Sequence, residues 1–403
     1  MSRLICLQAI GMIAACSFMP QETAAQQLTV YGKFDFGTYK VQGFTGAVAT
    51  FNGNATLATA HAGGLGGSLP GFATCTLDSG IHYVVNGATT TPFPAQANAG
   101  ATAIYAGKVT INASTSINKS VYVADTLMLN TGYLTIPPGD SLVITSGLPI
   151  AGGPFSNAKH IITAANVNTN SQGWMAVRTI SAPYLFPVGT GAYYLPATLS
   201  PVSNSGFVAG VFEGITNNAQ PGGTAFTAQQ LATEVNAVWR IQRTSGNNSC
   251  QLTLGWPQDL EGSDFSQAAH IGIAAYDSLW QDAAGQGDNA ANSAYKNFTQ
   301  FYAFTVAQKE CSQEQQQNGK MTLLPAAINK IWPNPVVDQL TITHSLTGSK
   351  VSITLYDLSG RMLHQEYAYS RQVSLKVPAL RPGMYMLSIS NGATTVTQPF
   401  LKQ

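Results

Sequence analysis

The chain has 403 residues, of which only 9% are charged, with 19 Lys and Arg against 18 Asp and Glu. An ordinary soluble domain carries roughly 25% charged residues, and a formal net charge of +1 supplies no basic surface for a nucleic acid. Apolar residues make up 45% of the chain, which excludes an intrinsically disordered protein. Thr, Val, Asn, Gly and Ser abound while strong helix formers are scarce, so the composition indicates an all-β protein with many turns.

Residues 1–25 are typical of a signal peptide. Arg3 supplies a positive charge, and the apolar run 4–15 is shorter than the roughly 20 residues of a membrane-spanning helix. Two processing sites fit the sequence. The small residues Thr23-Ala24-Ala25 suit cleavage before Gln26, whereas Ile13-Ala14-Ala15-Cys16 resembles a bacterial lipobox, in which Cys16 becomes a lipidated N-terminus.

Short alternating runs of apolar and polar residues fill the region 26–149, and each predicts a strand with one buried face. Asn and Gly recur between the runs, so we favour a β-solenoid of stacked parallel rungs, with a meander or an ordinary sandwich as the alternatives. The Gly- and Ala-rich segment 58–71 is predicted to be a mobile loop. The clearest runs are 108–111, 120–123, 126–129, 133–136 and 141–144.

The region 150–308 predicts an antiparallel β-sandwich, because seven strand-like runs occur there with only one short helical stretch, 227–236. The Gln-rich segment 309–330 cannot bury a core and is predicted to be a linker. The predicted strands are 160–162, 174–178, 184–189, 207–212, 237–241, 251–254 and 301–306.

Three cysteines, Cys75, Cys250 and Cys311, lie beyond the signal segment, and their spacing matches no zinc or haem motif. Export permits a disulfide. We expect Cys250 and Cys311 to pair because both lie in or beside one predicted domain, and unpaired thiols are the alternative.

Residues 331–403 predict a small Ig-like sandwich, with turns at 357–360 and at Pro382-Gly383. Three motifs follow one another in this region, and a basic residue lies near the end of the chain. The motif residues are Pro333, Asn334, Pro335, Tyr356, Asp357, Gly360, Arg361, Gly383, Tyr385, Leu387 and Lys402.

In order and spacing, these motifs resemble the type A C-terminal sorting domain of type IX secretion cargo. The resemblance implies passage through the periplasm, recognition by the type IX translocon, and removal of the domain by a sortase-like peptidase. The remainder is then released or attached to surface lipopolysaccharide, so the predicted location is secreted or the outer cell surface. The ending 398–403 departs from the Lys-flanked apolar tail of the family. We favour cleavage before Gln26 because a lipid on Cys16 would tether a cargo before it crossed the outer membrane.

The body carries a weaker resemblance. Phe186-Pro187-Val188-Gly189 and the later Trp239-Arg240-Ile241 resemble the marks of uncharacterised β-rich modules in surface proteins of the same bacteria. This resemblance implies a surface module and no particular chemistry.

No catalytic set, cofactor motif or metal-ligand cluster stands out, and we expect no enzyme and no cofactor. Gly139-Asp140-Ser141-Leu142 spells a lipase-esterase motif, but no histidine follows an Asp by three residues as that family requires. The alternative is a secreted polysaccharide-active enzyme that uses paired carboxylates among Asp259, Glu261 and Asp264. A polar loop after a strand is the simpler interpretation of that segment.

Three tripeptides of the form Asp, hydroxyl residue, Leu resemble the O-glycosylation acceptor pattern of exported proteins in the same bacterial group. They predict glycans on Thr126, Ser141 and Ser278, and ordinary strand and turn composition is the alternative.

The favoured function is a structural or adhesive surface protein that binds extracellular glycans, matrix or other cells, and no nucleic acid. Four aromatic residues are candidates for a sugar-stacking surface, although aromatic residues at strand spacing are more often part of the core. They are Trp174, Tyr184, Tyr193 and Tyr194.

Overall fold

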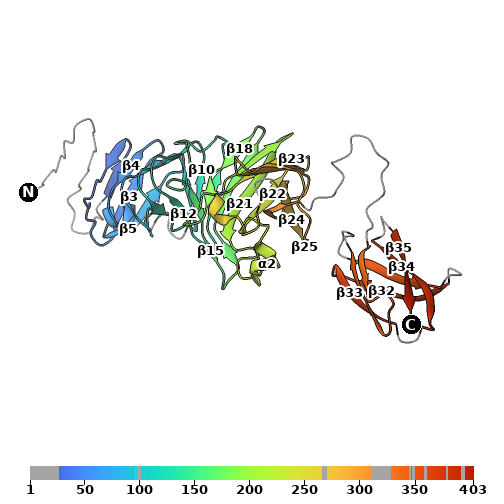
Figure 1. Ribbon diagram of the computed structural model, residues 1–403. Helices are drawn as coiled ribbons and strands as arrows, with labels where there is room; N and C mark the ends of the chain where they lie inside the picture. The colour runs from blue at the N-terminus through green and yellow to red at the C-terminus, as the bar shows by residue number, and fades with distance from the viewer. Residues whose placement is uncertain are drawn as a thin grey trace, which may run out of the picture. The chain divides into compact units, whose positions relative to one another are not determined.

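The computed structural model forms two compact units, Met1–Glu310 and Cys311–Gln403, shown in Figure 1. The described residues contain three short helices, α1 (Gly64–Ser68), α2 (Ala228–Leu231) and η1 (Gln258–Leu260), and are otherwise strands and turns. The all-β prediction is therefore confirmed. The residues that the structure describes are 27–95, 97, 101–265, 270–309, 328–344, 346, 350–357, 361–377, 380–391 and 395–403.

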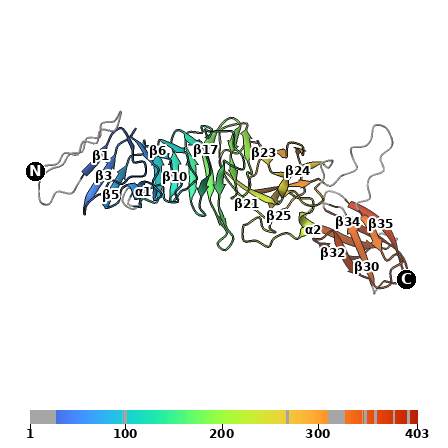
Figure 2. The same ribbon diagram turned by 60° about the vertical axis from the view of Figure 1, so that its left-hand side comes forward.

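The first part of the N-terminal unit is built from parallel strands. Consecutive strands belong to different sheets. Each strand pairs with one from the preceding or the following turn of the chain, so the turns lie side by side in chain order in Figures 1 and 2. One ladder contains β1 (Gln27–Val30), β3 (Ala47–Phe51) and β5 (Phe72–Leu77). A second contains β2 (Lys33–Asp35), β4 (Thr56–Thr59), β6 (His82–Val85), β8 (Lys108–Ile111) and β11 (Leu127–Leu129). A third contains β9 (Thr115–Ser116), β12 (Leu134–Ile136), β14 (Ile161–Thr163) and β19 (Val188–Gly189). A fourth contains β7 (Ala103–Ala106), β10 (Ser120–Val123), β13 (Ser141–Ile144) and β17 (Trp174–Ile180).

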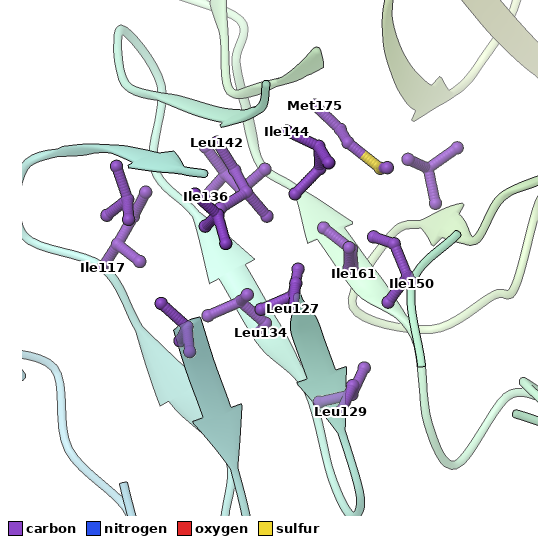
Figure 3. Packing of buried hydrophobic residues seen from close by; sticks show 14 of the residues in the cluster. Ile117, Leu127, Leu129, Leu134, Ile136, Leu142, Ile144, Ile150, Ile161 and Met175 are labelled. Carbon is purple, nitrogen blue, oxygen red and sulfur yellow. The ribbon is translucent and has the colours of Figure 1, made fainter. Parts of the chain in front are cut away.

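Apolar residues at alternate positions of these strands fill the space between the sheets. In β10, for example, Val121 and Val123 are buried while Tyr122 is not, as period-two alternation requires. Figure 3 shows side chains from several strands packing together, among them Leu134, Ile136, Leu142, Ile144, Ile161 and Met175.

A ladder of asparagines lies at one corner of the parallel region, after β6, β8 and β11. Asn112 Nδ2 donates to Asn86 Oδ1, and Asn130 Nδ2 donates to Asn112 Oδ1, each at 2.7 Å. Stacked amides satisfy one another in this way only when successive turns of the chain are in register. The recurrence of Asn between runs therefore has a structural role.

The second part of the N-terminal unit is antiparallel. Strands continue the fourth ladder from β17 into a nine-stranded sheet of order β25-β24-β28-β22-β21-β17-β13-β10-β7. The two regions divided at residue 149 in the sequence thus share one sheet, and one hydrophobic cluster runs from Leu28 to Val306. The added strands are β21 (Ser205–Glu213), β22 (Ala237–Ser245), β24 (Ile271–Asp277), β25 (Leu279–Trp280) and β28 (Ala303–Gln308). A five-stranded antiparallel sheet shares the cluster and contains β18 (Tyr184–Phe186), β20 (Ala197–Pro201), β23 (Cys250–Gly255), β27 (Ser293–Phe298) and β26 (Gln286–Asp288). A hairpin, β15 (Ala165–Asn166) with β16 (Ser171–Gln172), completes the unit.

The prediction of a mobile loop at 58–71 is wrong. Residues 56–59 are strand β4, and the helix α1 follows, with Leu65 and Leu69 buried in the core. Glycine makes this packing possible, since Gly64 has φ +58° and a Cβ there would lie 2.2 Å from the carbonyl oxygen of Thr91.

Two other predicted segments differ in detail. The run 184–189 is divided between β18 and β19, which belong to different sheets. Lys309, at the start of the predicted linker, is bonded to the N-terminal unit, because its N–H donates to the His270 carbonyl at 2.7 Å. At the other end, β29 (Ile328–Trp332) begins inside the predicted linker.

The C-terminal unit has two sheets around a separate hydrophobic cluster that includes Val336, Ile353, Leu387 and Phe400. One sheet has the order β29, β30 (Gln339–His344), β33 (Gln372–Lys376), and the other has β32 (Met362–Ala368), β31 (Val351–Tyr356), β34 (Gly383–Ser390), β35 (Thr395–Lys402).

No helix among the described residues of the chain is long and apolar enough to cross a membrane.

Candidate functional site

The structure brings the first sequence motif of the C-terminal unit against the end of the chain. Asn334 Oδ1 accepts a hydrogen bond from the Leu401 N–H at 2.8 Å. The Val336 N–H donates to the Leu401 carbonyl at 2.8 Å, and the Gln403 N–H donates to the Val336 carbonyl at 2.9 Å. The segment that contains Pro333 and Pro335 is therefore tied to β35, although some 60 residues separate the two along the chain.

The second motif is a turn closed by a carboxylate. Asp357 Oδ1 accepts from the Arg361 N–H and Asp357 Oδ2 accepts from Arg361 Nε, each at 3.0 Å. The guanidinium is exposed, with 76% of the Arg361 side chain accessible. Tyr356 ends β31 just before this turn, and Gly360 lies outside the described residues.

The third motif forms β34 and its contacts with β35. Gly383 pairs with Lys402, and Tyr385 pairs with Phe400. The Tyr385 and Phe400 rings stack at 5.8 Å between centroids, and the Tyr385 hydroxyl donates to the Arg381 carbonyl at 2.8 Å. Leu387 is fully buried, and Lys402 is buried with its Nζ donating to the Gln403 carbonyl. The first and third motifs thus hold β35 in place, and the second motif joins Asp357 to Arg361.

A second candidate lies on the outer face of the nine-stranded sheet, where alternate side chains of β7, β10, β13 and β17 point away from the core. Tyr105 and Tyr122 pair directly across β7 and β10. Their rings stack at 5.0 Å with an interplanar angle of 19°, and Tyr105 is 52% exposed. The Arg178 guanidinium carbon lies 5.7 Å from the Tyr122 ring centroid.

The same face carries a tryptophan and a second arginine. Trp174 begins β17 and pairs with Ser141 of β13. The Arg240 guanidinium carbon lies 5.0 Å from the Trp174 ring centroid, and its Nη1 donates to Gln172 Oε1 at 3.4 Å. Gly210 pairs with Arg240, and a Cβ at this glycine would lie 2.8 Å from the Gln172 side chain. We call Tyr105, Tyr122, Trp174, Arg178 and Arg240 the outer-face cluster.

The structure separates the four aromatic residues that the sequence grouped as a stacking surface. The surface position is wrong for Tyr184, which belongs to the core: its side chain is 3% exposed, and its hydroxyl donates to the Leu148 carbonyl at 3.1 Å. Tyr193 and Tyr194 are half-buried, and the Tyr194 ring lies 5.8 Å from the buried His160 ring. Only Trp174 of the four belongs to the outer-face cluster.

The sequence analysis missed Tyr105 and Tyr122. For Tyr122 a signal was present, since the flanking valines Val121 and Val123 point inward and alternation turns the tyrosine outward.

The three carboxylates proposed for catalysis occupy the loop after β23. Glu261 Oε1 accepts from Trp256 Nε1 at 3.0 Å, and Asp264 Oδ1 accepts from the Ser263 hydroxyl at 3.1 Å. Asp259 lies exposed in η1. Glu261 therefore orients a buried tryptophan.

A further acid, Glu234, lies beside this loop and carried no sequence signal. Its carbonyl accepts from the Gly262 N–H at 2.9 Å. Burial raises the pKa of Glu234 to about 8, and Oε2 has no hydrogen-bond partner among the described residues.

The three possible glycan acceptors differ in accessibility. Thr126 is half-buried and its hydroxyl donates to Asp125 Oδ1 at 2.9 Å; this hydrogen bond, with Lys108 close by, lowers the pKa of Asp125. Ser141 is half-buried at the start of β13. Ser278 is exposed in the turn between β24 and β25, with φ +63°.

Of the expected disulfide, only one partner is described. Cys250 is buried, with its thiol donating to the Gln251 carbonyl at 3.6 Å, and burial raises the pKa of this thiol to about 11. Cys311 lies outside the described residues, as do residues 1–25 with both predicted processing sites.

Residues 330–403 match the family model of the secretion system C-terminal sorting domain. The chain carries a type IX secretion sorting domain. Such a domain directs export to the cell surface or the extracellular space. The three sequence motifs lie within the matched residues, so the resemblance to a type IX secretion sorting domain is confirmed.

Two solved structures are similar to part of the chain. One is PorZ, described as an essential bacterial surface component of the type-IX secretion system of Porphyromonas gingivalis, at 12% identity and a TM-score of 0.18, covering 52% of this chain and 37% of that one. The other is dimeric latent PorU from Porphyromonas gingivalis, at 12% identity and a TM-score of 0.16, covering 52% of this chain and 18% of that one. The matched part is thus well under half the length of either protein. No curated protein matches the chain.

Proposed function

We propose that this protein is a surface-displayed or secreted binding protein, in which the sorting domain directs export and the β-rich body binds extracellular glycans or matrix. The observation that carries the proposal is the sorting-domain match at residues 330–403. The low charge of the chain, 9%, and the aromatic and arginine side chains of the outer-face cluster, of which Tyr105 and Arg178 are exposed, support a binding role for the body.

The proposed route has three steps. The signal peptide at 1–25 takes the chain to the periplasm, the type IX translocon reads the sorting domain, and the sortase-like peptidase cuts within the Gln-rich segment 309–330. The body is then released or attached to surface lipopolysaccharide. An N-terminal lipid on Cys16 is the competing fate, and the N-terminal sequence of secreted material distinguishes the two, because cleavage at the favoured site leaves Gln26 first.

We propose a β-solenoid for the parallel part of the body and an antiparallel sandwich for the rest, followed by an Ig-like sandwich in the sorting domain. The in-register parallel ladders and the asparagine ladder support the solenoid. The shared core of the nine-stranded and five-stranded sheets supports the first sandwich.

Binding without turnover is the proposed activity of the body. Glu261 is engaged by the Trp256 indole, which leaves Asp259 and Asp264 as the exposed carboxylates of that loop. A polysaccharide hydrolase panel tests this choice. Turnover that is lost in Asp264→Asn would replace the proposal by the enzymatic alternative, whereas glycan binding without turnover would support it.

O-glycosylation is proposed at the three acceptor positions, with Ser278 the most accessible of them. Intact-mass measurement on natively secreted protein, compared with Ser278→Ala, tests it. An unmodified mass in both proteins would rule the modification out.

Deletion of residues 331–403 tests the export assignment. We expect the truncated chain to accumulate in the periplasm and the full chain to reach the medium or the cell surface. Equal amounts of both outside the cell would overturn the assignment.

A further inference from the structure

We propose that the outer-face cluster binds an acidic polysaccharide, with Tyr105 and Trp174 stacking against sugar rings and Arg178 and Arg240 contacting carboxylate or sulfate groups. The inference names a ligand class and a site for the proposed binding function, and it rests on that function only in placing the body outside the cell.

The aromatic residues lie in two neighbouring rows of the same face. Tyr105, Tyr122 and Val143 pair in register across β7, β10 and β13, whereas Trp174 of β17 pairs with Ser141, two residues before Val143. Neighbouring strands lie about 4.8 Å apart, so the distance from the β7 ring to the β17 ring across the strands is roughly 14 Å. Aromatic faces bury the C–H faces of sugar rings while leaving hydroxyl groups in water. Rings this far apart suit several linked sugars better than one.

The positions between the rings do not obstruct a chain lying on the sheet. Val143 pairs with both Tyr122 and Ala176, so small or medium apolar side chains continue the row beyond the tyrosine pair. Ser120 and Ser141 flank it with hydroxyl groups and are half-buried. Alternation of rings, small residues and hydroxyls is a surface for a carbohydrate, because a protein partner would favour a continuous apolar patch.

The two arginines give the site its charge. Neither Arg178 nor Arg240 forms an ion pair with a described residue. Each guanidinium lies over an aromatic ring, which orients it without neutralising its charge. A planar guanidinium binds carboxylate and sulfate oxygens with two parallel hydrogen bonds, so an acidic sugar complements these positions and a neutral sugar does not.

Two further contacts shape the charge around the cluster. Asp140, in the turn before β13, has its Oδ1 bound by the Ser120 hydroxyl at 3.2 Å. Gln172 is 2% exposed, and its Nε2 has no acceptor among the described residues, although its Oε1 is bound by Arg240. Hydrogen-bond donors are therefore in excess around Arg240, where an anionic group would bind, whereas Asp140 places a negative charge beside Ser120.

The experiment uses the purified full chain and three glycans of similar length: a polyuronate, a sulfated glycosaminoglycan and a neutral glucan. Isothermal titration calorimetry at two salt concentrations gives the affinities. We expect binding to one or both acidic glycans, and at least ~10-fold weaker binding to the neutral glucan. The two acidic arms distinguish a carboxylate from a sulfate ligand.

Variants separate stacking from charge. Tyr105→Ala and Trp174→Ala should each weaken acidic-glycan binding about tenfold or more, Arg178→Ala should remove most of the preference over the neutral glucan, and Arg178→Lys should restore only part of it. Tyr39→Ala is the matched control, because Tyr39 is an exposed tyrosine (80%) that lies outside the cluster. Circular dichroism confirms that each variant is folded.

Three outcomes would overturn the proposal. They are no binding to either acidic glycan, equal affinity for the neutral glucan, and salt-sensitive binding that survives both aromatic substitutions, which would indicate unspecific attraction by charge. Because purified protein is used, failure here leaves the export experiment with residues 331–403 unaffected.

Discussion

At the scale of single residues, Asp357 should contribute more to the sorting domain than its ion pair suggests. One oxygen binds the exposed Arg361 guanidinium, and such exposed pairs contribute roughly 0–1 kcal/mol. The other oxygen accepts from the Arg361 N–H, which closes the turn. We therefore expect Asp357→Ala to abolish hydrogen-exchange protection of the Arg361 amide, whereas Arg361→Ala, which keeps the acceptor and the backbone donor, should retain protection at residue 361. Equal loss in both variants would contradict this role.

Glu234 should make the body less stable as the pH rises. Burial raises its pKa from 4.5 to about 8 in the folded protein, so between these values the folded state holds a proton that the unfolded state has lost. Stability is unaffected below the unfolded pKa and falls as the pH rises toward 8. Glu234→Gln should remove this loss and stabilise the body by on the order of 3 kcal/mol at pH 7.

Thermal unfolding at pH 4, 6 and 8 measures the effect of Glu234→Gln. The two proteins should converge at pH 4 and diverge with rising pH, because only the wild type carries the carboxyl group. Parallel curves over the whole range would show that Glu234 titrates normally.

Residue-level prediction from sequence succeeded where local pattern decides the outcome. The sorting motifs are defined by turn and strand chemistry, and they can be identified without knowing what lies opposite them. Tyr184 and Tyr122 show the limit. Both occur in alternating runs, but the core face is set by the neighbours: Phe186 and Tyr184 point inward together, whereas Val121 and Val123 turn Tyr122 outward. Aromatic character alone does not distinguish these cases.

At the scale of elements, the asparagine ladder should stabilise the stack of parallel strands in proportion to its bonds. Asn112 makes two amide–amide bonds, and Asn86 and Asn130 make one each within the ladder. A hydrogen bond of this kind contributes roughly 0.5–1.5 kcal/mol. We expect Asn112→Ala to cost about twice as much as Asn130→Ala, measured by urea unfolding of the full chain. An equal loss of unfolding free energy in the two variants would mean that the bonds between the asparagines do not contribute to stability.

The strands themselves were predictable, but the sheets were not. The runs 108–111, 120–123 and 141–144 are strands β8, β10 and β13, since β-branched residues at alternate positions identify them locally. Their partners are a circuit of the chain away: β10 pairs with β13 and β7, and not with β11. Period-two alternation predicts which face of a strand is buried, but it does not predict which strand lies beside it. For the same reason the sequence could not show that one sheet crosses residue 149.

At the scale of the whole molecule, the hydrophobic cluster of the C-terminal unit shares no residue with the two clusters of the N-terminal unit. The sorting domain therefore owes its fold to its own few strands. In a module of this size, a single large core side chain is a substantial part of the stability. Damage to that core should act on the fate of the entire chain, because export depends on the domain being recognised.

Phe400→Ala tests this dependence. Phe400 is 1% exposed and stacks on Tyr385, so its truncation should cost roughly 3–5 kcal/mol. We expect the full chain to be retained in the periplasm, as in the deletion of residues 331–403. Leu401→Ala is the matched control, since the neighbouring side chain is 40% exposed and its backbone bonds to Asn334 and Val336 persist. Immunoblots of periplasm, cell surface and medium give the distribution, and Phe400→Leu should restore export. Normal export of Phe400→Ala would show that recognition needs the terminal sequence and not the packed domain.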